Sequence, residues 1–175
     1  MSPSDGPQNR RQASPVELAA LLVQAVCVPG EGEEAAVTLV ADNLGLEAAS
    51  IGEELMYLRA FAIDFAVLMG LGDSPAKDQI LSRYYEHWKR IDEGAGGGTQ
   101  EAMEERLGAY AAAVGQSAQA QGGLSDEVGR QFASRCVAEG GLDATELVVF
   151  GGRMFAALYD GVVELLTEVE IILVE

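Results

Sequence analysis

Histidine, cysteine and basic side chains are scarce in this sequence. Its 175 residues include one histidine and two cysteines, and Lys and Arg number 11 against 28 Asp and Glu. A single histidine excludes a zinc site built from several histidines, and Cys27 and Cys136 are too far apart for a CxxC motif. We therefore predict no metal site and no cofactor. We interpret both cysteines as small apolar residues in a reducing compartment, the cytoplasm.

The shortage of basic side chains gives the chain a formal net charge of -17. A polyanion is repelled by such a field unless a local basic patch overcomes it, and Arg10-Arg11 and Lys89-Arg90 are the only adjacent basic pairs. We expect no nucleic-acid partner, and we expect any protein partner to present a basic face. The acidity is interpreted as a solubility feature, with adaptation to salt as the alternative.

Long uninterrupted apolar runs are absent as well. No segment reaches the ~18–20 residues that a membrane helix needs. The run 16–28 follows two arginines, as in a signal peptide, but Glu17 interrupts it. Ser14 and Pro15 instead suit the cap and first position of a helix. The sequence predicts no membrane span and a cytoplasmic location.

The alternation of apolar and polar residues that is typical of strands is missing, while apolar residues recur at helical spacing. The sequence predicts an all-α fold, a compact multi-helix bundle of about six or seven helices. Two helices, about 51–70 and 144–174, are strongly apolar and are predicted to be central. We expect a flexible leader over 1–13 and a single helical domain over 14–175. The Gly-rich loop 93–98 is the place to divide that domain if it has two subdomains.

Three segments match a capping box, in which a cap side chain and an acidic side chain three residues later bind each other's backbone N–H. They are Ser14 with Glu17, Ser50 with Glu53, and Asp143 with Glu146. Ser74, followed by a proline, predicts a further helix start. These positions define where the helices are expected to begin.

The closing helix carries its charges on one line, so the rest of its surface is apolar. Arg153, Asp160, Glu164 and Glu168 are predicted to face water. The candidate interface consists of the apolar residues Phe150, Phe155, Leu158, Leu165, Leu166 and Val169. Because a single bundle has room to surround one such helix completely, two of them indicate a shared interface and a homodimer.

One polar cluster is a candidate pocket. Asp64 lies within an apolar helix, where an unpaired buried carboxylate is costly, so it should meet a partner or have a raised pKa. Its available partners are Arg59, Arg90, Arg153, Tyr84 and Tyr85. A pocket around it would be lined by Tyr84, His87 and Arg90. The simpler interpretation is a structural contact for Asp64 and a position at the edge of an amphipathic helix for His87.

No catalytic motif is found. Glu31/Glu34 and Glu101/Glu104 have the Glu-x-x-Glu spacing, but no Glu-x-x-Asp follows either pair, so no magnesium site is predicted. The leading hypothesis is an acidic helical protein that acts through protein contacts, in an assembly, regulatory or chaperone-like role, and self-associates. The alternative is a small-molecule- or metal-dependent helical enzyme with its pocket near Asp64 and His87.

Overall fold

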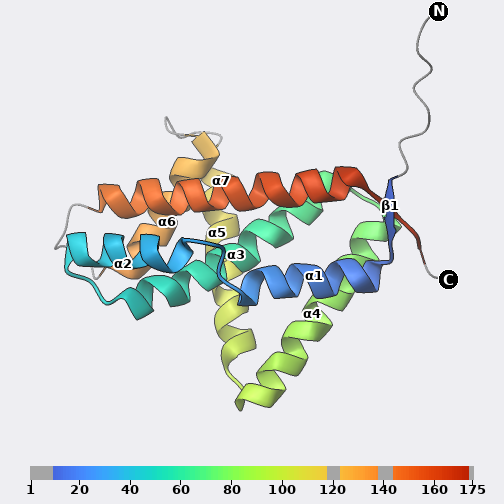
Figure 1. Ribbon diagram of the computed structural model, residues 1–175, viewed down its shortest axis with the longest axis horizontal. Helices are drawn as coiled ribbons and strands as arrows, with labels where there is room; N and C mark the ends of the chain where they lie inside the picture. The colour runs from blue at the N-terminus through green and yellow to red at the C-terminus, as the bar shows by residue number, and fades with distance from the viewer. Residues whose placement is uncertain (1–9, 118–122, 138–143, 174–175) are drawn as a thin grey trace, which may run out of the picture.

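The computed structural model describes residues 10–117, 123–137 and 144–173. Within them the chain forms an all-α bundle with one pair of very short strands (Figure 1). The elements are β1 (Arg11–Ala13), α1 (Pro15–Cys27), α2 (Glu33–Leu44), α3 (Ala48–Leu71), α4 (Pro75–Ala95), α5 (Thr99–Ser117), α6 (Gly123–Cys136), α7 (Thr145–Glu168) and β2 (Val169–Ile171). The predicted all-α bundle is confirmed.

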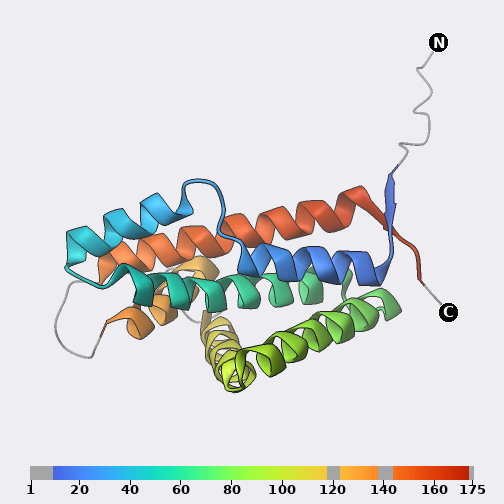
Figure 2. The same cartoon turned by 60° about the horizontal axis from the view of Figure 1, so that its bottom comes forward.

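Helix α3 is the centre of the bundle, as its sequence predicted. It contacts each of the other helices in the described structure. Its side chains are buried around most of its circumference, from Ile51 to Val67, and they include Glu54 and Arg59. Figure 2 shows α1 and α2 on one side of α3 with α4 and α5 on the other. The apolar surface of α3 is therefore covered within one chain.

Two apolar clusters make up the core. One joins α1 to α4 and includes Tyr84 and Trp88, and the other surrounds Phe61. The Phe61 ring stacks on Tyr110 at 5.2 Å and on Phe155 at 5.9 Å between ring centroids. Both clusters contain residues from before and after the loop 93–98.

Helices α6 and α7 pack unusually closely because glycines meet at their contact. A Cβ atom added to Gly129 would overlap the backbone carbonyl oxygen of Val148. One added to Gly152 would lie 2.6 Å from the carbonyl oxygen of Ser125. The glycines of α7 lower the stability of this helix because glycine has a low helix propensity. Their lack of a side chain allows α6 to approach the backbone of α7.

The closing helix is shorter than the predicted 144–174, and two three-residue strands form where the sequence shows no strand pattern. The helix ends at Glu168, and the chain continues as β2, which pairs in parallel with β1 in the register Arg11↔Val169. The β-branched residues Val169 and Ile171 suit a strand, but their partner lies far away in sequence, where periodicity cannot reveal it. Both ends of the described chain therefore lie together (Figure 1).

The predicted leader 1–13 is only partly described. Residues 1–9 lie outside the described residues, and Arg11–Ala13 form β1. The Ile172 N–H donates to the carbonyl oxygen of Ala13 at 3.0 Å, just beyond the strand pair. A segment distant in sequence thus holds the last residues of the leader.

The predicted helix starts have mixed outcomes. The Ser14 capping box is confirmed: its Oγ accepts from the Glu17 N–H at 3.3 Å, and its own N–H donates to Glu17 Oε2 at 2.8 Å. Ser74 caps α4 as predicted. Ser50 does not begin α3, because the helix starts earlier, at Ala48. Asp143 lies outside the described residues.

The Gly-rich loop connects α4 to α5 in a V-shaped hairpin, whose tip lies at the bottom of Figure 1. Gly96, Gly97 and Gly98 all have positive φ, which favours glycine. Asp92 Oδ1 accepts from the Thr99 N–H at 2.6 Å and the Gln100 N–H at 3.1 Å, so it caps the start of α5.

Among the described helices, none combines the length and the apolar character needed to cross a bilayer.

Candidate functional site

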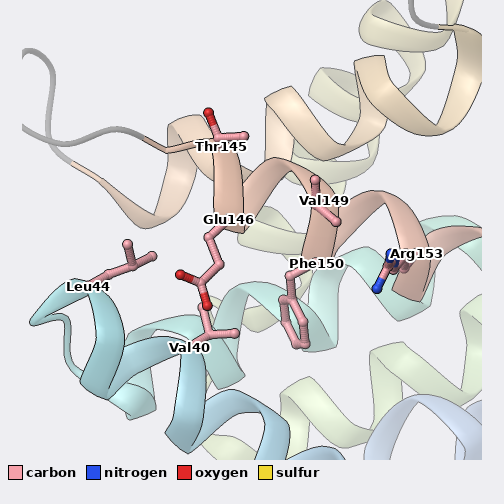
Figure 3. A pocket seen from close by; sticks show the side chains of 7 residues that line it. All are labelled: Val40, Leu44, Thr145, Glu146, Val149, Phe150 and Arg153. Carbon is pink, nitrogen blue, oxygen red and sulfur yellow. The ribbon is translucent and has the colours of Figure 1, made fainter.

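A groove of about 650 Å³ lies between α2 and the first turns of α7. Figure 3 shows Glu146 reaching from α7 toward Val40 on α2, with Phe150 beside it and Arg153 further along α7. The lining residues are Val40, Leu44, Thr145, Glu146, Val149, Phe150 and Arg153. The volume lies within the range typical of binding sites in proteins.

The groove exists because α2 and α7 share neighbours without packing closely on each other. Both helices pack on α3, and α7 also packs on α6. A hydrogen bond crosses the groove, from Asn43 Nδ2 on α2 to Glu146 Oε1 on α7 at 2.9 Å. That bond joins the two helices near the start of α7.

The α7 side of the groove is one helical face. Glu146, Val149, Phe150 and Arg153 fall at intervals of three, one and three residues, which keeps them within about 100° of arc at 3.6 residues per turn. The face therefore places an apolar centre between a carboxylate and a guanidinium about 10 Å apart along the axis. Val149 is 46% exposed despite being apolar.

Arg153, like Arg10, Arg11 and Arg90, forms no salt bridge within the described residues. It is exposed, and it also makes no hydrogen bond in the part of the chain that the structure describes. Five other arginines do pair with carboxylates: Arg59, Arg83, Arg106, Arg130 and Arg135. A guanidinium free at the edge of an apolar groove is available to a ligand or partner.

Helix α2 also carries one strongly exposed apolar side chain. Leu39 is 62% exposed, the highest exposure among the large apolar side chains of the described residues. It precedes the groove residue Val40 and lies four residues before Asn43, on the same side of α2 as Asn43. An exposed leucine here extends the apolar surface beyond the groove itself.

Of the partners expected for Asp64, the structure places Tyr85 beside it. Tyr85 donates to Asp64 Oδ1 at 2.6 Å, and the half-buried carboxylate has no cationic partner among the described residues. Burial raises the pKa of Asp64, while the Tyr85 hydrogen bond lowers it. Burial and the Asp64 contact both raise the pKa of Tyr85.

The other members of the predicted pocket lie elsewhere. Tyr84 points into the core, where its hydroxyl lies 3.5 Å from the Ala60 carbonyl oxygen. His87 is two residues beyond Tyr85, so the two side chains leave α4 about 200° apart. Arg90 is exposed. The structure thus brings Asp64 to Tyr85 and does not bring it to His87.

The candidate interface residues are divided between the core and the surface. Phe155, Leu166 and Val169 are buried within the chain. Leu158 and Leu165 are partly buried against the two core clusters, and Phe150 lines the groove. The four charged residues of the closing helix, Arg153, Asp160, Glu164 and Glu168, are all exposed.

A buried polar network links α3 to α5. Tyr110 donates to Glu54 Oε1 at 2.7 Å, and Arg106 Nε donates to Glu54 Oε2 at 2.8 Å. Burial raises the pKa of Glu54, while these two hydrogen bonds lower it. Burial, with a smaller effect of Glu54, raises the pKa of Cys136 to about 12. Such a satisfied network fixes the helix register, and the thiol stays protonated.

A second buried ion pair joins α2 to α3. Arg59 Nη1 lies 2.5 Å from Glu33 Oε1, and both side chains are largely buried. The Nε of Arg59 is buried without a partner, as is the indole nitrogen of Trp88.

A smaller cavity of about 310 Å³ lies beside the strand pair, between α1 and the end of α7.

Within the described residues, no group of three or more His, Cys, Asp or Glu side chains is arranged to hold a metal ion. Comparison with protein-family models, with curated proteins and with solved structures found no match. The groove is thus the feature from which a function is best inferred.

Sequence reasoning found only one residue of this groove among its interface candidates, Phe150. The α2 residues were missed because Val40 and Leu44 look like ordinary core positions of an amphipathic helix. The i, i+7 pair of Glu146 and Arg153 was visible, but nothing in the sequence indicated that α2 would leave that face open.

Proposed function

We propose that the chain acts through protein contacts made at the α2–α7 groove. The proposal depends on one exposed face of α7, where Val149 and Phe150 form an apolar centre between Glu146 and the unpaired Arg153. An apolar centre with a charged rim is the usual composition of a protein interface. The two opposite charges would also set the direction in which a partner lies.

The shape of the groove supports a helical occupant. Helices α2 and α7 form its walls (Figure 3). An amphipathic helix can place side chains at i, i+3 and i+4 into such a groove. The matching segment would carry apolar anchors, a cation near Glu146 and a carboxylate near Arg153.

The charge of the whole chain bears on the partner's other surfaces. A net charge of -17 favours association with faces that are neutral or basic outside the contact itself. The cytoplasm is part of the proposal, because Cys27 and Cys136 are free thiols in the structure. Assembly, regulatory and chaperone-like roles all use contacts of this kind.

The enzymatic alternative needs Asp64 and His87 in a common pocket. Tyr85, which binds Asp64, and His87 leave α4 on opposite sides. Among the described residues, no observation favours a catalytic site at either residue.

The test is a selection of amphipathic helical peptides displayed on phage against the full chain, followed by calorimetric titration. We expect the selected peptides to bind the wild type and to lose at least about tenfold in affinity with Val149→Glu, because a charge enters the apolar centre. Leu68→Glu is the matched control: Leu68 is 39% exposed, near the end of α3. It should leave binding unchanged.

Two results would contradict the proposal. One is peptide binding that is equal for the wild type and Val149→Glu. The other is failure to recover any peptide while a small apolar anion, 8-anilinonaphthalene-1-sulfonate, binds in a manner that Val149→Glu abolishes. The second result would make the groove a small-molecule site.

A further inference from the structure

We propose that the occupant of the groove is a second copy of this chain, paired antiparallel with the first across the N-terminal turns of α7. This inference rests on the proposed function of the groove and names its partner. The two chains would be related by a twofold axis that passes between Val149 and Phe150.

The charges of the α7 face are self-complementary in that arrangement. Glu146 and Arg153 lie at equal distances on either side of the midpoint between Val149 and Phe150. An antiparallel copy therefore places Glu146 opposite Arg153 of the second copy, and its own Glu146 opposite Arg153 of the first. Because a twofold interface repeats every contact, one such face supplies two ion pairs.

The apolar surface is covered by the same pairing. Val149 and Phe150 of the two chains would meet at the axis, where the α7 helices cross. The exposed Leu39, which precedes the groove residue Val40 on α2, would be covered by the second copy. The result is a four-helix layer that contains α2 and α7 from each chain.

The acidic end of α7 favours the antiparallel direction. Asp160, Glu164 and Glu168 are exposed on the C-terminal half of the helix. With the axis near Val149, the two C-terminal halves point away from each other, so these carboxylates remain apart. A parallel pair would place the acidic halves side by side, and like charges in close contact are unfavourable.

Arg153 supplies the remaining reason for an acidic contact. The chain has 28 acidic residues, yet within the described residues none pairs with this exposed guanidinium. Glu146 of a second copy would pair with Arg153, while the Glu146 Oε1 atom keeps its bond from Asn43. The Oε2 atom is then the acceptor for the guanidinium.

The experiment measures self-association by sedimentation velocity at 0.15 M NaCl, where the Debye length of about 8 Å limits repulsion between the acidic chains. Glu146→Arg and Arg153→Glu should each weaken the dimer by at least about tenfold, because each opposes two like-charged pairs. The double variant Glu146→Arg/Arg153→Glu should recover the wild-type affinity. A mixture of the two single variants should form a heterodimer, since all its pairs are opposite in charge.

Arg90→Glu is the matched control for charge reversal, because Arg90 is exposed as Arg153 is but lies on α4, outside the groove. It should leave the dimer within about threefold of wild type. A wild type that stays monomeric at 0.5 mM would overturn this inference, and so would single variants that dimerise normally. If the wild type is monomeric but still binds peptides in a manner that depends on Val149, the proposed function of the groove stands. Only the proposal that the occupant is a second copy of the chain is then contradicted.

Discussion

The hydroxyl of Tyr110 lies 2.7 Å from a carboxylate oxygen of Glu54 and donates a hydrogen bond to it in the middle of the bundle. Tyr110 is fully buried and Glu54 is 5% exposed. The contact joins α3 to α5, and it is the most deeply buried side-chain hydrogen bond to a charged group in the described structure.

Tyr110→Phe should lower the free energy of unfolding by about 2 kcal/mol, because a hydrogen bond to a buried charged group is worth about 1.5–3 kcal/mol. The measurement is urea denaturation followed by circular dichroism. Tyr85→Phe is the matched control, since it removes the hydrogen bond to the half-buried Asp64. Its effect should be smaller because water can replace the lost donor. Equal losses would contradict the importance of burial here.

Glu54 also predicts a pH dependence. Burial raises its pKa in the folded chain, so the folded state binds this proton more tightly than the unfolded state. The stability from protonation is full below the ordinary pKa of about 4.3 and disappears as the pH rises through the folded pKa. The stability of the wild type relative to Glu54→Gln should therefore fall as the pH rises from the ordinary pKa of about 4.3 through the raised folded pKa. A stability difference between the wild type and Glu54→Gln that grows with pH would contradict this prediction. It would show that the hydrogen bonds from Arg106 and Tyr110 affect the pKa of Glu54 more than burial does.

The contact between α6 and α7 predicts opposite effects for two glycines. Gly129→Ala should destabilise the chain by at least about 3 kcal/mol, because the new methyl group meets the rigid backbone of Val148. Gly161→Ala should stabilise it by about 0.5–1 kcal/mol, because nothing lies within 4 Å and alanine favours a helix. Chemical denaturation measures both. A harmless Gly129→Ala would show that α6 and α7 are further apart.

Two serines that match the same sequence motif should differ in their effect. Ser14→Ala should lower the free energy of unfolding by about 1 kcal/mol, because Ser14 caps α1. Ser50→Ala should change it by less than about 0.5 kcal/mol, because Ser50 is exposed and lies within α3. The two variants can be compared by thermal unfolding. If Ser50→Ala lowers the free energy of unfolding as much as Ser14→Ala does, Ser50 is the N-cap of α3 and this prediction is wrong.

The sequence by itself determined the helices, because their signals are local. Apolar spacing indicated each amphipathic helix, and Ser14 and Ser74 marked two helix starts that the structure confirms. The apolar character of α3 indicated its central place. The charged line on α7 indicated the side of that helix that faces water.

The tertiary structure decided everything that depends on residues far apart in the chain. Val169 became a strand because Arg11 lies beside it, and Asp64 was paired with Tyr85 by the packing of α3 on α4. The groove arises because α2 and α7 both pack on α3, and Asn43 and Glu146 bridge the two helices. Helical periodicity specifies which face of a helix is apolar. Which neighbour covers that face, and which part of it stays open, is set by the packing of the whole bundle.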